Sequence, residues 1–522
     1  MDLRGAQEKV LILLVEPISK NIGMYVPAFP LPVMEIAGYV KQQLPEVDIS
    51  VISLPIDFGL PLTPAGKEAL YREFLNEIAT TKPKGIGISC TAIAQAEEVI
   101  HLCELIKDYD PGIFIFLGGY FPTIYHEDIF SRTSAVDLIV TGEGEIPTCK
   151  IVEALEKDQN PFNSEISNLT WKKNGKIYST PRGPRFDLGQ KALLDLNLLK
   201  YPRAYDILPY AFSRGCSYKC RFCMEDLIRP HRKEVPAEIV NRDLLNLSRQ
   251  NSARTLLVSD ALFKSFDLFS LFHSLGMKVN FETRCDVFDP AIIPQIADFC
   301  GMMALGFESA SYDTLKRMNK VRNKAHYETY ISKTSAIFKE AVKNGIPIMV
   351  FMIAGYPGDT ENDLEQSLRF AKKLAQNKGP GGYVFKIGEC RAYPKTKTHQ
   401  LALDLEDVVF DDDGVFGDNV VRQPSQNLKF ETVLAYMKEI FDLSHNTLQI
   451  YDVLLKIMPF FRLPVVALQD EIIPDNCFRY VDRAVINVQG ESLSTFRELA
   501  PRLGEKYRDG MSGQRSRRNL TL

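Results

Sequence analysis

Short apolar runs alternate with amphipathic stretches along the first third of the chain. The apolar runs VLILLV, ISVISL, GIGIS, IFIFLGG and VDLIVTG each have the length of one strand, and helical patterns separate them. Continuous apolar strands separated by helices are typical of a parallel sheet that is covered on both faces. The pattern from residue 10 to about residue 155 therefore predicts a five-stranded, doubly wound, flavodoxin-like (Rossmann-type) α/β domain.

This rhythm breaks between residues 159 and 209. The segment NLTWKKNGKIYS predicts a small hairpin that turns at Asn174-Gly175, a pair that favours a tight turn, and Trp171 would pack this hairpin down. The remainder is rich in Pro, Arg and Asp, which is typical of a linker. We therefore expect a first domain over residues 1–158 and a linker with a hairpin over residues 159–209.

Strand and helix patterns alternate again from about residue 210 to residue 403. Six apolar runs, from YAFSRG to YVFKIGE, are separated by helical stretches. Six β/α units over residues 210–410 predict a partial parallel barrel, with its mouth at the carboxyl ends of the strands. Helical patterns at Glu431–Ser444 and Leu448–Met458 predict a small α-rich C-terminal domain over residues 411–522, with a basic tail that frays into solvent.

Composition narrows the classes of function. The balance of 62 Lys and Arg against 66 Asp and Glu leaves no bulk positive field to attract nucleic acid or anionic lipid. No apolar run reaches the roughly 20 residues that cross a bilayer. Ten cysteines are sparse in a chain of 522 residues, which indicates a reducing compartment. We expect a cytoplasmic protein with a small-molecule substrate, no nucleic-acid partner and no integral membrane segment.

Three cysteines stand close together directly after the first run of the barrel, in SRGCSYKCRFCMED: Cys216, Cys220 and Cys223. A loop with this spacing can bring three sulfurs to one point. Three thiolates supply three of the four ligands of a cubane iron-sulfur cluster and leave one iron open to a small molecule. A structural zinc site is the alternative, with Cys285, His231 or an acidic residue as its fourth ligand.

The motif Cys216-x3-Cys220-x2-Cys223, with Phe222 before the last cysteine, resembles the signature of the radical S-adenosylmethionine superfamily. The resemblance implies a [4Fe-4S] cluster that binds S-adenosylmethionine at its open iron and cleaves it reductively to a 5′-deoxyadenosyl radical. It also implies a low-potential electron donor such as flavodoxin or ferredoxin. The protein would orient the cofactor and exclude competing reactions. No residue can be assigned from the sequence as a catalytic acid or base.

Downstream strand ends are similar to those of the B12-linked branch of this superfamily. In MMALGFESASYDTLKRMNK, Glu308 and Ser309 would lie at the barrel mouth, and in MVFMIAGYPGDT, Gly355 would let the backbone approach the adenosyl group. In VNFETRCD, Glu282 and Arg284 resemble the strand end whose arginine meets the carboxylate of S-adenosylmethionine, which an Arg fork suits. For each charged residue, an ordinary ion pair at the barrel rim is the alternative.

Small residues gather at the predicted strand ends of the first domain, where open parallel sheets bind ligands. These strand ends resemble the cobalamin-binding domain that precedes many radical enzymes. The implied B12-binding positions are Ser89, Thr91, Gly118, Gly119, Gly142, Glu143 and Gly144. The Asp-x-His-x-x-Gly element that ligates cobalt in some cobalamin proteins is absent, so the lower face of cobalt would be left to water or to a non-histidine residue. Alternatively, the domain has kept the fold and lost the cofactor.

The combined resemblance implies a radical enzyme in which cobalamin carries a methyl group to an unactivated carbon of a small molecule, such as a lipid or natural-product intermediate. Two alternatives remain open. One is a radical cyclase, oxidase or rearrangement enzyme in which no methyl group moves. The other is a corrinoid-binding or redox-sensing module without turnover.

Overall fold

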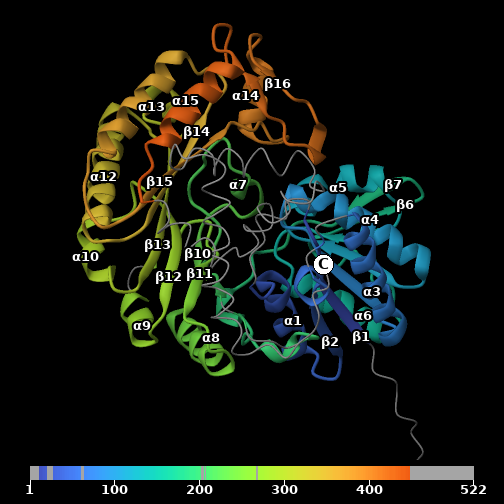
Figure 1. Cartoon of the computed structure of the whole chain (residues 1–522). Coiled ribbons are helices and arrows are strands. Elements are labelled where there is room, and N and C mark those ends of the chain that lie inside the picture. The colour runs from blue at the N-terminus through green and yellow to red at the C-terminus, as the bar shows by residue number, and fades with distance from the viewer. Residues whose placement is uncertain are drawn as a thin grey trace, which may run out of the picture.

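The structure, a computed structural model, describes residues 11–19, 28–59, 61, 64–201, 205, 207–265 and 268–446. Two sheets, each covered by helices, account for most of this part of the chain (Figure 1). The expected helix at Leu448–Met458 and the basic tail lie outside the described residues.

The N-terminal domain is built on a sheet with the strand order β2-β1-β3-β4-β5-β6-β7. Its first five strands pair in parallel, as the sequence predicted, and buried side chains lie on both faces. These strands are β1 (Leu11–Glu16), β2 (Asp48–Ser53), β3 (Gly85–Ser89), β4 (Phe114–Gly118) and β5 (Leu138–Val140). The helices are α1 (Leu31–Gln43), α2 (Leu54–Asp57), α3 (Pro64–Thr81), α4 (Ile93–Tyr109), α5 (Tyr120–Arg132) and α6 (Glu145–Glu156).

The predicted hairpin is present as β6 (Leu169–Lys173) and β7 (Lys176–Ser179). Asn174 and Gly175 form its turn with φ of 50° and 75°, a left-handed conformation that this pair adopts easily. Trp171 stacks on Tyr178 across the hairpin, with ring centroids 5.8 Å apart. The sequence did not predict that β6 pairs antiparallel with β5, which extends the sheet to seven strands.

The segment expected to be a linker is packed into the protein over residues 186–199. Its buried apolar side chains belong to the same core as those of α1 and α6. At its end, Leu199 forms a bridge with Val51 of β2, and the Lys200 amide donates to the Val51 carbonyl at 2.8 Å. Residues 186–199 therefore join the two domains through shared core contacts.

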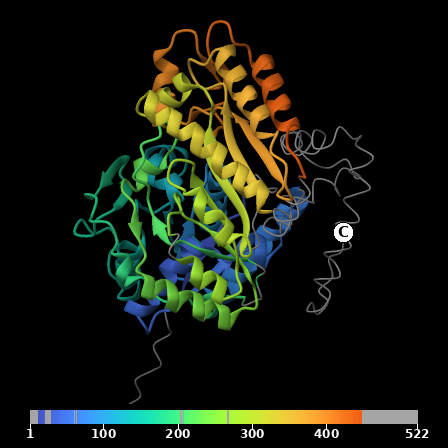
Figure 2. The same cartoon turned by 90° about the vertical axis from the view of Figure 1, so that its left-hand side faces the viewer.

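The second sheet has the order β15-β14-β13-β12-β11-β8, and all its strands are parallel. Figure 2 shows yellow helices in front of its strands. The predicted partial barrel of six strands is thereby confirmed. Its strands are β8 (Ile207–Tyr210), β11 (Thr255–Val258), β12 (Lys278–Arg284), β13 (Cys300–Glu308), β14 (Ile348–Ala354) and β15 (Tyr383–Glu389). Its helices are α8 (Ala237–Gln250), α9 (Phe269–Ser274), α10 (Ile293–Ile296), α11 (Tyr312–Arg317), α12 (Lys324–Lys343), α13 (Glu361–Leu374) and α14 (Lys397–Asp404).

The first barrel strand starts three residues earlier than the apolar run YAFSRG indicated. The end of that run forms β9 (Ser213–Arg214), which pairs antiparallel with β10 (Lys233–Glu234), and the cysteines lie between these two strands with the short helix α7 (Glu225–Ile228). Beyond residue 404, the chain forms the small antiparallel pair β16 (Val409–Phe410) and β17 (Val421–Gln423). The predicted helix near residue 431 is α15 (Phe430–Asp442), which packs on α13 and β15.

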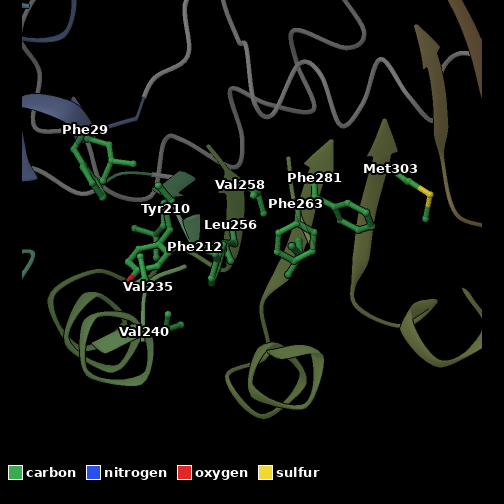
Figure 3. Packing of buried hydrophobic residues seen from close by; sticks show 14 of the residues in the cluster. Phe29, Tyr210, Phe212, Val235, Val240, Leu256, Val258, Phe263, Phe281 and Met303 are labelled. Carbon is green, nitrogen blue, oxygen red and sulfur yellow. The ribbon is translucent and has the colours of Figure 1, made fainter. Parts of the chain in front are cut away.

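Aromatic residues fill the layer between the barrel strands and their helices. Figure 3 shows Phe212, Phe263 and Phe281 in this layer, where neighbouring ring centroids lie 5.7 and 5.1 Å apart. Their tilted and edge-on contacts are the arrangements that aromatic rings prefer. The same core continues into the α1 and α6 side of the first sheet, so the two domains share one hydrophobic interior.

Charged side chains are also buried at this junction. Arg214, at the end of β9, lies 2.8 Å from a carboxylate oxygen of Glu35 in α1 and 2.5 Å from one of Glu145 in α6. Lys191 contacts Glu35 at 3.3 Å and Asp243 of α8 at 2.8 Å. We call Glu35, Glu145, Lys191, Arg214 and Asp243 the junction charge cluster.

The two glutamates of this cluster respond differently to their surroundings. Burial raises the pKa of both, but the charges of Arg214 and Lys191 outweigh it at Glu35 and hold that pKa below its usual value. At Glu145, burial prevails over Arg214, and repulsion from Glu35 adds to it, so the pKa of Glu145 is raised. The ionised carboxylate of Glu35 therefore stabilises the folded state.

We expect the substitution Glu35→Gln to destabilise the protein at neutral pH, because Arg214 and Lys191 lose a carboxylate partner. Removing one partner of a buried ion pair costs about 3–5 kcal/mol, which lowers a thermal midpoint by roughly 10 °C. Since the folded-state pKa of Glu35 lies below 4.5, its contribution is present above that pH and is lost as the pH falls through the folded-state pKa. Thermal unfolding at a series of pH values measures both effects.

The matched control is Glu46→Gln, because Glu46 is exposed on the loop after α1. Its midpoint should stay within a degree or two of the wild-type value, as exposed substitutions rarely cost more than about 0.5 kcal/mol. Equal midpoints for the two variants would show that the junction charge cluster does not stabilise the fold.

Candidate functional site

The segment that carries Cys216, Cys220 and Cys223 is called the cysteine loop. It starts at a position that requires glycine. Gly215 has φ of 87°, and a Cβ there would lie 2.4 Å from the His231 carbonyl oxygen. This close approach lets the His231 amide donate to the Cys216 carbonyl at 3.2 Å. The Arg221 amide donates to the Met318 carbonyl at 3.0 Å and fastens the middle of the loop. The sequence analysis missed Gly215, although it stands directly before the cysteine motif.

The three motif cysteines are free thiols on this loop. Cys216 and Cys220 are half-buried, and Cys223 is exposed. In the part of the chain that the structure describes, no three His, Cys, Asp or Glu side chains stand close enough to hold a metal ion as they lie. The donor chemistry nevertheless fits an iron-sulfur cluster, because three unpaired thiols share one short loop. Their role as ligands stays a prediction.

Arg284 extends from the end of β12 to this loop. Its Nη1 lies 3.2 Å from Cys220 Sγ, and its guanidinium stacks 3.8 Å from the ring centroid of Tyr218. Nε and Nη2 both donate to the Asp286 carboxylate at 2.9 Å. Burial raises the pKa of Asp286, but these bonds and the charge of Arg284 outweigh it and hold that pKa below its usual value. The arginine that the sequence assigned to S-adenosylmethionine thus contacts a motif cysteine.

Glu308 lies at the end of β13, the strand next to Arg284. It is buried, has φ of 71°, and forms an ion pair with Lys320 at 2.7 Å. The Lys320 carbonyl in turn accepts from Arg284 Nη2 at 3.2 Å. The structure therefore brings Arg284 and Glu308 together, through a lysine that the sequence analysis did not single out.

The other predicted positions for S-adenosylmethionine have different surroundings. Ser309 is buried, and its hydroxyl lies 3.1 Å from that of Ser367 in α13. Gly355 has φ of 73° and packs against the C-terminal segment, so a Cβ there would lie 3.1 Å from Pro424 Cγ. Glu282 stands on β12 two residues before Arg284 and is exposed. Their contacts with the cofactor stay predictions.

Two glycines at the end of β4 have opposite surroundings. Gly118 faces open space, because a Cβ there would have no atom within 4 Å beyond its chain neighbours. Gly119 has φ of 108°, and a Cβ there would lie 2.4 Å from the Cys90 carbonyl oxygen. Thr123 ties this end to the next loop, since it donates to the Gly119 carbonyl at 2.7 Å and accepts from the Gly142 amide at 2.9 Å. Gly118 leaves room for a ligand, and Gly119 serves the turn.

The remaining predicted B12 positions also include open positions and positions whose contacts serve the fold. Ser89 lies beside Gly118 in the sheet, Thr91 is exposed, and a Cβ on Gly142 would meet open space. Glu143 instead accepts from Arg185 Nη2 at 3.0 Å and from the Phe186 amide at 2.8 Å, so its carboxylate fastens residues 185–186. A Cβ on Gly144 would lie 2.9 Å from Ile36 Cδ1 in α1, where it serves helix packing.

We call the edge of the first sheet that carries Gly118 and Gly142 the glycine edge. It lies next to the cysteine loop. Helix α5 starts after Gly119, and α7 starts after Met224; the two helices are in contact. Tyr125 of α5 has its hydroxyl 3.8 Å from Met224 Sδ, and the Arg229 guanidinium lies 4.7 Å from the ring centroid of Tyr120. Ligands bound at the two edges would therefore lie on the same side of the protein.

Two domain families match the chain in the order of the two sheets. Residues 25–152 match the B12 binding domain, and residues 210–371 match the radical SAM superfamily. An uncharacterized methyltransferase of Pyrococcus horikoshii is 24% identical over 70% of this chain and 78% of its own length. The anaerobic magnesium-protoporphyrin IX monomethyl ester cyclase of Synechocystis sp. is 26% identical over 59% of this chain and 63% of its own length.

A solved structure agrees with the fold of both domains. It is that of the radical S-adenosylmethionine methyltransferase TsrM from Kitasatospora setae, with cobalamin and a [4Fe-4S] cluster bound. The likeness has a TM-score of 0.63 at 13% identity and covers 83% of this chain and 89% of TsrM. Such low identity supports the fold alone.

The parallel barrel and the cysteine loop, with the matched domain, define a radical S-adenosylmethionine enzyme. The chain belongs to the members of this superfamily that carry a B12-binding domain in front of the barrel. The two matched domains imply a [4Fe-4S] cluster, S-adenosylmethionine and cobalamin as its cofactors. The open space at Gly118 and Gly142 fits a large ligand at the sheet edge. No helix among the described residues combines the length and apolarity needed to span a bilayer.

We expect Arg284→Gln to lower the reduction potential of the bound cluster, because a cationic donor near a ligand sulfur stabilises the more negative, reduced state. A loss of about 1 kcal/mol corresponds to on the order of 50 mV for a one-electron couple. A redox titration followed by electron paramagnetic resonance measures this shift, with iron content determined in parallel. The exposed Arg249→Gln variant is the control. An unchanged potential in Arg284→Gln with full iron content would show that the Cys220 contact does not act on the cluster.

The two glycines of β4 give a second test. Gly118→Val should fold normally and bind hydroxocobalamin at least tenfold more weakly, because its side chain enters the open space at the sheet edge. Gly119→Ala should lower the thermal midpoint before any ligand is added, because its Cβ clashes with the Cys90 carbonyl and its φ is unfavourable. Absorption spectra after desalting measure cobalamin retention. Normal retention in Gly118→Val would place the cofactor elsewhere.

Proposed function

We propose that this enzyme is a cobalamin-dependent methyltransferase that adds a methyl group to an unactivated carbon of a small molecule. The observation that carries the proposal is the contact between α5 and α7, which sets the glycine edge of the first sheet beside the cysteine loop. A substrate between these two edges can reach both cofactors without a large domain movement. The methyltransferase relative from Pyrococcus horikoshii supports the same reaction class.

When bound, the cluster with S-adenosylmethionine supplies a 5′-deoxyadenosyl radical, and cobalamin supplies a methyl group, as membership of this branch implies. The chain's own residues hold and orient these groups. Cys216, Cys220 and Cys223 would hold the cluster, and Arg284 keeps a cationic donor on Cys220. Ser89, Gly118 and Gly142 would leave the sheet edge open for cobalamin.

Two properties of the cellular setting belong to this proposal. Reductive cleavage needs an electron from outside the chain, and a low-potential flavodoxin or ferredoxin has the required chemistry. The sparse cysteines indicate that the enzyme works in a reducing cytoplasm, where an iron-sulfur cluster and free thiols persist.

A second candidate function is a radical cyclisation in which no methyl group moves. The similarity to the magnesium-protoporphyrin IX monomethyl ester cyclase favours it, although that match spans 63% of the cyclase. Product analysis separates the two functions. Methyl transfer yields S-adenosylhomocysteine together with 5′-deoxyadenosine and methionine, whereas cyclisation yields no S-adenosylhomocysteine.

We expect the anaerobically reconstituted protein to hold about four iron and four sulfide per chain. Single Ala substitutions at Cys216, Cys220 or Cys223 should lower iron content and abolish reductive cleavage of S-adenosylmethionine, because the cluster loses one of its three ligands. Cys149→Ala is the control, since Cys149 is buried in α6 away from the loop. Iron analysis and chromatography of 5′-deoxyadenosine measure the outcome. A variant lacking all three motif cysteines that still released 5′-deoxyadenosine would disprove the cluster assignment.

The same incubation, with S-adenosylmethionine labelled in its methyl group, tests the reaction class. The proposal requires S-adenosylhomocysteine to form in a cobalamin-dependent manner. If 5′-deoxyadenosine and methionine accumulate with cobalamin bound and S-adenosylhomocysteine is absent, the cyclase function replaces methyl transfer.

A further inference from the structure

The inner face of the barrel has an apolar floor. Buried side chains from four strands and from Ala28 form one cluster there: Ile207, Met302, Ala304, Met349 and Val384, with the partly buried Leu257, Phe351 and Phe441 against it. These residues alternate along their strands with residues of the outer core, as expected for the inward face of a barrel. The floor is suited to the apolar body of a substrate.

Two opposite charges stand on this inner face. Lys386 follows Val384 by two residues on β15, and its Nζ lies 5.4 Å from the ring centroid of Phe351. Glu282 is the register partner of Ala304, and neighbours in a parallel sheet point to the same face. Lys386 and Glu282 therefore project from two separate strands toward the interior above the floor.

Neither side chain has an ion-pair or hydrogen-bond partner among the described residues. The buried cations Arg284 and Lys320 of the barrel do have such partners, namely Asp286 and Glu308. Burial lowers the pKa of Lys386, and the attraction of Glu282 only partly opposes it. Two groups of opposite charge on one inner face, each without a direct partner, leave room for a ligand that contacts them.

Glu282 shows what kind of space this is. Its side chain is exposed to solvent, yet burial raises its pKa, with Lys386 opposing and Glu308 adding to the rise. Lys386 on the same face is half-buried, so solvent reaches both charged side chains.

We propose that Lys386 binds an anionic group of the substrate, so that the substrate is a small, mainly apolar molecule with a carboxylate or a phosphate. An ammonium group that is partly buried and has no counterion among the described residues gains free energy when an anion replaces its lost water. Glu282, on another strand of the same face, repels that anion and so directs it to the β15 side. This inference rests on the proposed function, because it assigns the substrate class of the same barrel.

The simplest probe pair is decanoate and decanol, which share an apolar chain and differ in charge. The anaerobically purified full-length protein is labelled briefly with a trace of acetic anhydride, and the acetylation of each lysine is measured by peptide mass spectrometry. Decanoate should slow the acetylation of Lys386 at least fivefold, and decanol should not. The exposed Lys378 is the internal control and should react equally in all samples. Equal protection by both probes, or protection by neither, would overturn the proposal.

Substitutions then test the charge directly. Calorimetric titration with decanoate should show at least tenfold weaker binding to Lys386→Gln than to the wild type, and Lys386→Arg should restore most of the affinity. Lys378→Gln should bind as the wild type does. If Lys386→Gln and Lys386→Arg bind decanoate as tightly as the wild type, Lys386 is not the anion-binding group.

This outcome is separate from that of the proposed function. Iron content, cobalamin retention and cleavage of S-adenosylmethionine without substrate are measured on the same preparations. If decanoate binding depends on Lys386 but no S-adenosylhomocysteine forms, the anion site stands and methyl transfer falls. If S-adenosylhomocysteine forms normally and decanoate protects no lysine, the reaction class stands and the anion site falls.

Discussion

The buried ion pairs of Arg214 set how the two sheets lie against each other. The hydrophobic interior that the domains share is non-directional and would tolerate small rotations. Charged groups removed from water need partners at hydrogen-bond distance, and Arg214 finds them in Glu35 and Glu145 of two different helices. Because Cys216 follows Arg214 by two residues, the contacts that orient the domains also place the start of the cysteine loop.

The local sequence pattern predicted most helices and strands, but it did not predict which of them pair or pack together. The apolar runs predicted the five parallel strands and the six barrel strands, because each strand is buried on both faces and contains few polar residues. The pair Asn174-Gly175 predicted the hairpin, since the turn depends on those two residues alone. No local signal shows which sheet edge a hairpin will join, so the pairing of β6 with β5 could not be predicted. The packing of residues 186–199 was also not predicted, because their apolar side chains stand among Pro, Arg and Asp, a composition typical of a linker.

In the candidate site, too, residues with a local signal were predicted, and their partners from distant parts of the chain were not. Three cysteines within eight residues were predicted as ligands because their chemistry and spacing are both local. Arg284 was expected at a strand end and lies there, but its partners Tyr218 and Cys220 stand more than sixty residues earlier, beyond the reach of a pattern. Glu143 was expected at the B12 site because VTGEGE resembles a strand end of the cobalamin-binding domain; the sequence did not show that its carboxylate accepts from Arg185 and the Phe186 amide. A residue type indicates what a side chain can bind, and only the fold decides which partner reaches it first.

The packing of residues 186–199 bears on how such proteins recombine. These residues share one core with α1 and α6, and Lys191 among them supplies Glu35 with a cation. A chimaera joined just after the end of the B12-binding match at residue 152 would either set this segment against a foreign surface or leave Glu35 with an unrelated partner, depending on which half comes from this chain. Crossovers that preserve the interface would carry α1, α6 and the chain up to Arg214 together. The unit that gene fusion can exchange is therefore longer than the domain that sequence similarity delimits.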